Sequence, residues 1–265
     1  PIISGKVSIY QCGPTVYWTQ HIGNMRAMVM ADFLTRMCRY VGYDVVFVRN
    51  YTDVGHLTSD QDEGEDKMER GAAREGKTPK EIAKKYIAIF ENDLTLLNVV
   101  APTHRPKATE YVPQMIDFVQ ALIDKGYAYV TPLAVYFDVS KAKDYTRLSR
   151  QVIEQNVTEA GHGKMSDPEK RHPADFAVWF FKAGAYEHAL QTWPNPFSDK
   201  EGFPGWHIEC SAMIKALFGT TIDIHIGGIE HVSIHHTNEI AQSEALTNSP
   251  LAHYWIHNEH LLVDG

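Results

Sequence analysis

The first fifty residues alternate between apolar runs and a helical pattern, and this order restricts the folds open to the chain. Gly5 to Gln11 is rich in β-branched and aromatic residues and predicts a buried strand, and Asn24 to Tyr40 predicts a helix that ends at Gly42. Asp44 to Val48 is a near-continuous apolar strand, typical of a parallel sheet covered on both faces. A strand, a helix and a second strand in this order predict a right-handed βαβ unit and an α/β fold.

Apolar residues in the predicted helix recur at spacings of three and four positions, which places them on one face of the helix. These residues are Val29, Phe33, Leu34, Met37 and Val41. We expect this face to pack against the sheet. Cys38 lies in the same helix and is expected to be a small buried side chain of the core.

The middle of the chain has weaker patterns. Ser59 to Lys80 is crowded with Asp, Glu, Lys and Gly, and it predicts an exposed loop and a frayed helix. Helical spacing returns from Pro79 to Leu97 and from Ala108 to Lys125. Tyr127 to Val130 and Val135 to Val139 predict a β-hairpin.

From Lys141 to about Gly202 the periodicity fades and Pro, Gly, Asp and His become frequent, with Asp175 to Phe181 as one strong strand. This change indicates an inserted α+β subdomain rather than a continuation of the parallel sheet. We therefore expect residues 1–105 to form the first half of the α/β domain. Residues 106–201 would be a helical continuation with the insertion, and residues 202–265 the second half of the α/β domain.

The net charge, the number of cysteines and the absence of long apolar runs argue against several classes of protein. The chain has 25 basic and 33 acidic residues, a formal net charge of −8, so it lacks the overall basic excess of many nucleic-acid-binding proteins. Any contact with a nucleic acid must be a local patch. Three cysteines, Cys12, Cys38 and Cys210, do not suit a disulfide framework and favour a reducing cytoplasm. No apolar run approaches the length of a membrane span.

The stretch from Cys12 to Asn24 joins the first predicted strand to the first predicted helix. Gly13 and Pro14 break the strand, and His21-Ile22-Gly23-Asn24 lies where a helix exposes its free backbone N–H groups. Such a helix start suits an anion such as a triphosphate. A cysteine at a strand end is most often a small buried hydrophobe, so Cys12 alone indicates no ligand.

A second informative region runs from Gly202 to Glu239. His235 and Glu239 are four residues apart, so on a helix they project from one face, whereas His236 would point elsewhere. Taken alone, the pair is more typical of a surface ion pair. Together with Cys210 and Cys12 it makes a donor set of two thiolates, an imidazole and a carboxylate, which suits tetrahedral zinc.

These two regions resemble a known family. Cys12-Gly13-Pro14-Thr15, followed by His21-Ile22-Gly23-Asn24, is similar to the signature of the class I aminoacyl-tRNA synthetases, and the whole chain is similar to the catalytic part of the cysteinyl-tRNA synthetases. The resemblance implies a Rossmann-type α/β fold with an inserted subdomain, and one zinc ion held by Cys12, Cys210, His235 and Glu239. It also implies a cytoplasmic enzyme, expected to be monomeric, that uses ATP with Mg²⁺ to activate L-cysteine and transfers it to tRNA(Cys).

The resemblance assigns roles to individual residues. His21 and Asn24 would be catalytic. Thr52, which also follows the second predicted strand, where parallel sheets bind ligands, would contact cysteine together with Trp206 and His225. The residues implied for ATP are Gly13, Pro14, Thr15, His21, Gly23, Asn24, Gly227, Gly228, Glu230, Trp255, His257 and Asn258.

The chain departs from the family pattern at several positions. Ile226 replaces the first of three glycines and is expected to place a branched side chain beside the nucleotide. Glu230 stands where an aspartate contacts the ribose and keeps the carboxylate. The family's mobile lysine loop, with the sequence KMSKS, and its anticodon-binding domain would follow Gly265. We therefore expect the chain as given to bind cysteine and zinc but to activate cysteine poorly.

Two other functions remain open from the sequence. A related enzyme of the mycothiol pathway joins activated cysteine to an amino sugar, although Asn238-Glu239-Ile240-Ala241-Gln242-Ser243-Glu244 is more similar to the tRNA synthetases. A catalytically silent zinc-binding paralogue is the alternative from another class. Exchange of pyrophosphate into ATP stimulated by cysteine separates both enzymes from the silent protein, and charging of tRNA separates the two enzymes.

Overall fold

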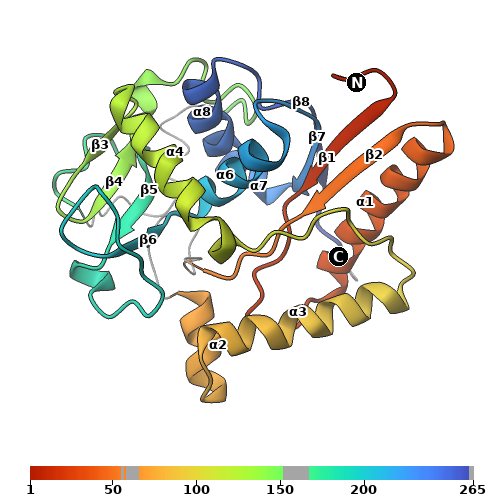
Figure 1. The fold of residues 1–265 in the computed structure, drawn as a ribbon, viewed down its shortest axis with the longest axis horizontal. Coiled ribbons are helices and arrows are strands. Elements are labelled where there is room, and N and C mark those ends of the chain that lie inside the picture. Colours follow the sequence, from red (N-terminus) through yellow and green to blue (C-terminus); the bar gives the residue numbers. More distant parts are fainter. Residues whose placement is uncertain (55–56, 58–65, 152–166, 263–265) are drawn as a thin grey trace.

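A computed structural model describes residues 1–54, 57, 66–151 and 167–262, and within them the chain forms two four-stranded sheets (Figure 1). The first sheet is parallel, with the order β2-β1-β7-β8. Its strands are β1 (Lys6–Gln11), β2 (Asp44–Arg49), β7 (Ile222–Gly228) and β8 (Ala252–Asn258). The second sheet is antiparallel, with the order β3-β4-β5-β6. Its strands are β3 (Ala128–Val130), β4 (Ala134–Phe137), β5 (Phe176–Phe181) and β6 (Gly202–Pro204).

Helices cover the parallel sheet on both faces, with α1 on one side and α6 and α8 on the other (Figure 1). The α-helices are α1 (Ile22–Tyr40), α2 (Lys67–Glu75), α3 (Pro79–Leu96), α4 (Val112–Asp124), α6 (Trp206–Phe218), α7 (Glu230–Ser233) and α8 (His235–Thr247). One core cluster contains Val48 of the parallel sheet, Ile208 of α6 and Val178 of the antiparallel sheet, so the two sheets share a hydrophobic core. No helix among the described residues is long and apolar enough to cross a membrane.

Successive side chains of strand β1 point to opposite faces of the parallel sheet. Val7 and Ile9 pack with Ala31 of α1, whereas Tyr10 belongs to the core cluster that contains α6 and α8. This alternation follows from the two-residue period of a strand. Continued past the end of β1, it directs Cys12 toward α6 and α8, and Cys12 belongs to the same cluster as Tyr10. Strands β1 and β2 are parallel neighbours joined by α1, which confirms the predicted βαβ unit.

The predicted buried face of α1 is wrong for four of its five residues, since only Leu34 is partly buried and packs against the core. Phe33 is 72% exposed and Val41 63% exposed, and Val29 and Met37 are also exposed. The buried residues are Met25, Met28, Ala31, Asp32, Thr35 and Cys38. The small residues Ala31 and Cys38 pack against strand β1, and Met25 and Met28 pack with residues of α2 and α3. Cys38 lies in the core, as expected.

The later elements agree with the patterns except in one segment. The predicted helix at Pro79 begins with Thr78 and Glu81 in a capping box, and the predicted hairpin is formed by β3 and β4. The charged segment Ser59 to Lys80 is not wholly exposed, because Lys67–Glu75 forms α2 and Met68 is fully buried. Residues 59–65 of that segment lie outside the described residues.

Candidate active site

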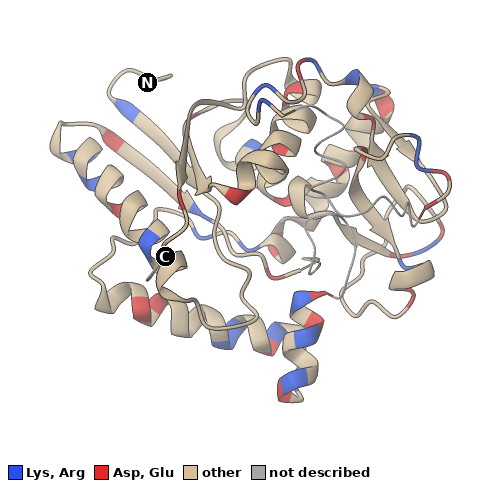
Figure 2. Cartoon of the chain, turned by 180° about the vertical axis from the view of Figure 1, so that it is seen from behind, with Lys and Arg blue, Asp and Glu red and all other residues tan. Residues whose placement is uncertain are grey.

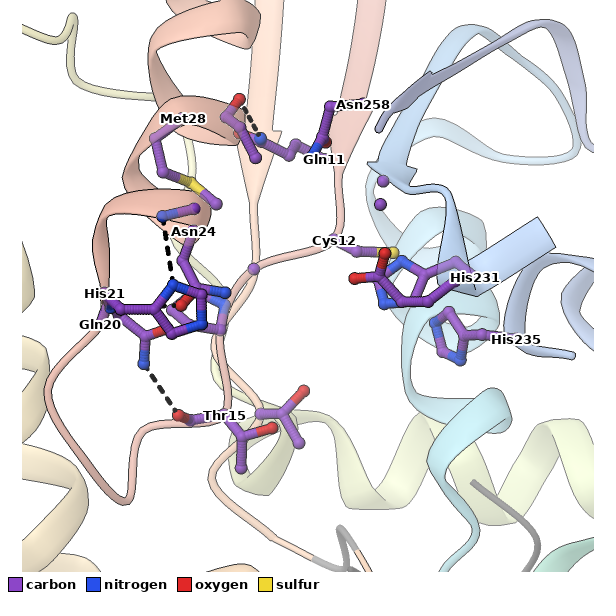
Figure 3. A pocket seen from close by; sticks show the side chains of 18 of the residues that line it. Gln11, Cys12, Thr15, Gln20, His21, Asn24, Met28, His231, His235 and Asn258 are labelled. Atoms are coloured by element: carbon purple, nitrogen blue, oxygen red, sulfur yellow. Dashed lines mark hydrogen bonds between the residues drawn. The ribbon is translucent and has the colours of Figure 1, made fainter. Parts of the chain in front are cut away.

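Helix α1 begins with a capping box made by the two polar side chains of its first turn. The imidazole Nδ1 of His21 accepts a hydrogen bond from the N–H of Gly23 (3.1 Å), and Asn24 Oδ1 accepts one from the N–H of His21 (3.2 Å) (Figure 3). The remaining N–H groups of the first turn and the helix dipole make this end electropositive. No acidic side chain lies in the first turn, so the end suits an anion.

A cavity of about 600 Å³ lies at the carboxyl ends of β1, β2 and β7, beside the start of α1. This is the edge where parallel α/β sheets bind ligands. Its lining includes most of the residues that the sequence singles out: Cys12, Gly13, Pro14, Thr15, His21, Gly23, Asn24, Thr52, Trp206, Cys210, Gly227, Gly228, Glu230, His235 and Asn258. In Figure 3, His21 and Asn24 lie on one side of this cavity, and Cys12 and His235 lie on the other.

Four metal-ligating side chains converge at the wall of this cavity. The ligand atoms of Cys12, Cys210, His235 and Glu239 all lie within 4.8 Å of one another. The two sulfur atoms are 3.9 Å apart, Cys12 Sγ is 3.9 Å from Glu239 Oε1, and His235 Nε2 is 2.8 Å from the same oxygen. Tetrahedral zinc with bonds of about 2.0–2.3 Å would hold its ligand atoms about 3.3–3.8 Å apart. The separations at the sulfur atoms are close to this range, and His235 and Glu239 would have to move apart from their 2.8 Å hydrogen-bond distance.

Neighbouring histidines orient the members of this cluster. His225 Nε2 lies 3.0 Å from Glu239 Oε2, which leaves Oε1 facing the cysteines. His207 Nδ1 lies 3.0 Å from His235 Nδ1, which leaves Nε2 of His235 facing the cluster. Outer contacts of this kind set the tautomer and orientation of metal ligands. The described part of the chain therefore contains a cluster suited to a metal ion.

His236 also belongs to this cluster, and the expectation that it points elsewhere is wrong. Its Nε2 lies 3.5 Å from Cys12 Sγ, and with His225, Glu239 and Cys12 it forms a second set of ligand atoms within 4.8 Å. Helix α8 begins at His235, so its first residues lie between α6 on one side and β7 and β8 on the other. His235 stacks on Trp206 of α6 and His236 contacts His257 of β8, yet both approach Cys12.

The charges in the cluster are strongly coupled. The hydrogen bond with Cys12 lowers the pKa of the Cys210 thiol to about 6 against the effect of burial, whereas burial raises the pKa of the Cys12 thiol. Burial lowers the pKa of His235, but the charge of Glu239 and the hydrogen bonds to Cys210 and Glu239 outweigh it and raise that pKa to about 10. Cys210 is therefore the thiol that ionises first.

The predicted cysteine-binding residues occupy different places. Thr52 and Trp206 line the cavity. His225 does not line it, because it is fully buried between Glu239 and Trp255, whose ring stacks on it with centroids 4.6 Å apart. The structure therefore places His225 behind the metal-ligating cluster rather than in the cavity wall.

The residues predicted to bind ATP also differ in whether they line the cavity. Trp255 and His257 are absent from the cavity lining, and Ile226 is fully buried in the core beneath α1, not beside the cavity. The two glycines of β7 are packed tightly: a Cβ on Gly227 would lie 2.5 Å from the His236 ring, and one on Gly228 would lie 2.2 Å from the carboxylate of Glu230. Larger residues at either glycine would displace side chains that line or support the cavity.

Some residues that line the cavity were not predicted from the sequence. Trp18 lies in the loop between β1 and α1, Lys67 begins α2, and His231 lies in α7. Lys67 belongs to a charge run that predicts only a solvated face. His231 stands four residues before His235, and this spacing is a signal that could have indicated it.

Gly13 fixes the junction between the ends of β1 and β2. Its N–H donates to Asn50 Oδ1 (2.8 Å), and a Cβ at this position would lie 1.6 Å from the backbone oxygen of Asn50. Gly13→Ala is therefore expected to lower the free energy of unfolding by about 3 kcal/mol, because the two backbones must separate. Thermal or urea unfolding measures the change.

Gly23→Ala is the matched control for this prediction. A Cβ at Gly23 meets only atoms of the His21 ring, at 3.0 and 3.1 Å, and alanine is favoured over glycine in a helix by about 1 kcal/mol. The control should change the free energy of unfolding by less than about 1 kcal/mol. Equal effects of the two substitutions would contradict the role given to Gly13.

Solved structures of low sequence identity share this fold. Mycobacterium tuberculosis methionyl-tRNA synthetase in complex with methionyl-adenylate superposes with a TM-score of 0.67 at 12% identity, covering 96% of this chain and 57% of that chain. A second structure of the same enzyme with methionyl-adenylate gives a TM-score of 0.67 at 13% identity. The chain therefore has the Rossmann-type α/β fold of a class I synthetase catalytic domain, as the sequence predicts.

The sequence also defines the particular family within this class. Residues 1–265 match the family described as "tRNA synthetases class I (C) catalytic domain", and the chain belongs to this family. It is 45% identical over 264 residues to the cysteine–tRNA ligase of Treponema denticola, and 44% identical over 264 residues to cysteine–tRNA ligase 1 of Burkholderia lata. These matches cover 100% of this chain but 53% and 55% of the relatives. The chain thus spans about half the length of the curated relatives that it matches.

Proposed function

We propose that this chain is the catalytic part of a cysteine–tRNA ligase, which activates L-cysteine with ATP. One observation carries the proposal: Cys12, Cys210 and His235 line the same cavity as His21 and Asn24. Soft metal ligands and an electropositive helix start thus face one shared space. An amino acid with a thiol suits the soft metal ligands, and a nucleoside triphosphate suits the electropositive start of α1.

We assign the cluster to zinc, held by Cys12, Cys210, His235 and Glu239. When bound, zinc would supply a site that stabilises a substrate thiol as its thiolate. A serine hydroxyl is a harder ligand that stays protonated, so it would bind poorly there. Cavity shape alone would separate two such similar side chains by only about 1–3 kcal/mol. The donor set therefore explains selection of cysteine better than shape does.

The start of α1 would hold the phosphates of ATP, which carries Mg²⁺. As the cysteine carboxylate attacks the α-phosphorus, a new P–O bond forms, the bond to the bridging oxygen breaks and pyrophosphate leaves. His21, Asn24 and the first N–H groups of α1 would stabilise the charge that develops on the phosphates. Thr52 and Trp206 would position the amino acid, and Glu230 would face the ribose. The 3′ hydroxyl of tRNA(Cys) would then take the aminoacyl group. We propose that the enzyme is a monomer and acts in the cytoplasm.

Binding selectivity tests this proposal in the chain as it is. Calorimetric titration of the zinc-loaded protein should show that cysteine binds at least about 100-fold more tightly than serine, since the direct metal–sulfur bond adds to the small contribution of shape. Pyrophosphate exchange with ATP should depend on cysteine. Equal affinities for cysteine and serine would overturn the proposal.

A further inference from the structure

Trp18 presents a large aromatic surface at the cavity. It lies in the loop between β1 and α1, lines the cavity and is 47% exposed. Tryptophan buries much of its area in most proteins, so a half-exposed ring in a cavity wall is available for a ligand. Neither the cysteine side, formed by Cys12 and Cys210, nor the phosphate side at His21 accounts for this ring.

Contacts from two helices hold the ring in place. The guanidinium carbon of Arg74, on α2, lies 3.8 Å from the centroid of the Trp18 ring, a cation–π contact. Arg74 Nη2 also donates to the backbone oxygen of Tyr17 (2.8 Å) and to the Tyr86 hydroxyl (3.3 Å). The Tyr86 ring, on α3, lies 5.9 Å from Trp18. The ring is thus supported on a rigid base and is not a freely moving surface side chain.

Basic groups accompany the ring. Lys67, the first residue of α2, lines the same cavity, and Arg74 lies one and a half to two turns further along that helix. Figure 2 shows both basic and acidic positions along α2. Glu75 lies 3.6 Å from Arg74 and also pairs with Lys77 and Lys85, and Asp66 caps the helix that carries Glu69. Lys67 and Arg74 are thus two basic side chains at this side of the cavity, on a chain whose net charge is −8.

A supported aromatic ring beside basic groups is the arrangement by which proteins hold single-stranded nucleic acid. Every base offers a face for stacking, and the cations attract the phosphates that follow it. ATP is the other ligand with a base, but the glycines and Glu230 proposed for it belong to β7 and α7, whereas Trp18 contacts α2 and α3.

We infer that Trp18 stacks on a base of the single-stranded 3′ end of the tRNA, with Arg74 supporting the ring and Lys67 facing the adjoining phosphate. This inference rests on the proposed function, since it names the surface that admits the third substrate to the same cavity. It places the point of entry between the β1–α1 loop and α2, which both contribute to the cavity lining.

Binding of an acceptor-stem RNA hairpin tests the inference. The probe is a fluorescently labelled hairpin with a 3′ ACCA overhang, compared with the same hairpin lacking the overhang, and anisotropy gives the affinities. The unchanged protein should bind the overhang form more tightly. Trp18→Ala should weaken that binding about 5- to 100-fold, the range of stacking on one base, while Trp18→Phe keeps most of it. Neither substitution should change binding of the blunt hairpin.

Matched variants and a second readout separate the outcomes. Phe33→Ala removes an aromatic ring that is 72% exposed on α1 and does not line the cavity, so it should leave RNA binding unchanged. Lys67→Ala should weaken overhang binding and make it less dependent on salt, because Lys67 is the side chain assigned to the phosphate. Overhang binding that is absent in the unchanged protein, or equal in Trp18→Ala, would overturn the inference. Cysteine-selective binding by the same zinc-loaded sample would show that the proposed function survives that failure.

Discussion

Cys210→Ser is expected to lower the affinity of the protein for zinc by more than about 100-fold. Changes to residues that only contact metal ligands already cost 10- to 100-fold, and this substitution replaces a ligand itself by a protonated hydroxyl. Cys210 is the thiol of the cluster whose pKa is lowered, to about 6, so it provides the thiolate most readily. Metal analysis after dialysis against a competing chelator measures the loss, and cysteine binding should disappear with the metal.

Cys38→Ser is the control for this result. Cys38 lies on the buried face of α1 and packs with Val7 and Ile9, outside the metal-ligating cluster, so its hydroxyl variant should keep one zinc per chain. A Cys210→Ser protein that retains zinc as tightly as the control would show that Cys210 is not a ligand. His236 would then be the side chain to examine, because its Nε2 lies 3.5 Å from Cys12 Sγ.

His21→Asn is expected to slow formation of cysteinyl adenylate by roughly 10²- to 10³-fold, the usual effect of removing one group that stabilises developing charge. Asparagine is a good N-cap residue, so the substitution keeps the cap of α1 and removes only the imidazole. Cysteine binding should change little, because Cys210, His235 and Thr52 remain. Single-turnover assays of adenylate formation, beside calorimetry with cysteine, measure the two effects.

His188→Ala is the matched control, since the side chain of this histidine is 93% exposed and pairs with its neighbour Glu187. It should leave both the rate and the affinity unchanged. An equal loss of cysteine binding and adenylate formation in His21→Asn would show that His21 supports the cavity generally and does not act on the phosphates.

The sequence predicted the site best where the positions of its residues follow from the order of the strands or from the spacing within one helix. The parallel βαβ unit put Cys12 and Thr52, which follow its two strands, at one edge of the sheet, and both line the cavity. Spacing on α8 put His235 and Glu239 on one face, where their ligand atoms are 2.8 Å apart. These inferences depend on local geometry, which the sequence determines directly.

The predictions that failed depend on tertiary packing. Spacing in α1 showed which residues share a face but not which face meets the sheet, and Phe33 is exposed while Ala31 is buried. His236 contacts Cys12 because the first turn of α8 lies between two elements, which no periodicity reveals. Trp18 lines the cavity because α2 and α3 hold it there, and those helices come fifty or more residues later in the chain.

The central claim is that a metal held by Cys12 and Cys210 binds the thiolate of the substrate. X-ray absorption at the zinc edge counts the sulfur atoms about 2.3 Å from the metal. The zinc-loaded protein should show two sulfur ligands alone, three after addition of cysteine, and two after addition of serine. A count that stays at two in the presence of saturating cysteine would contradict the claim.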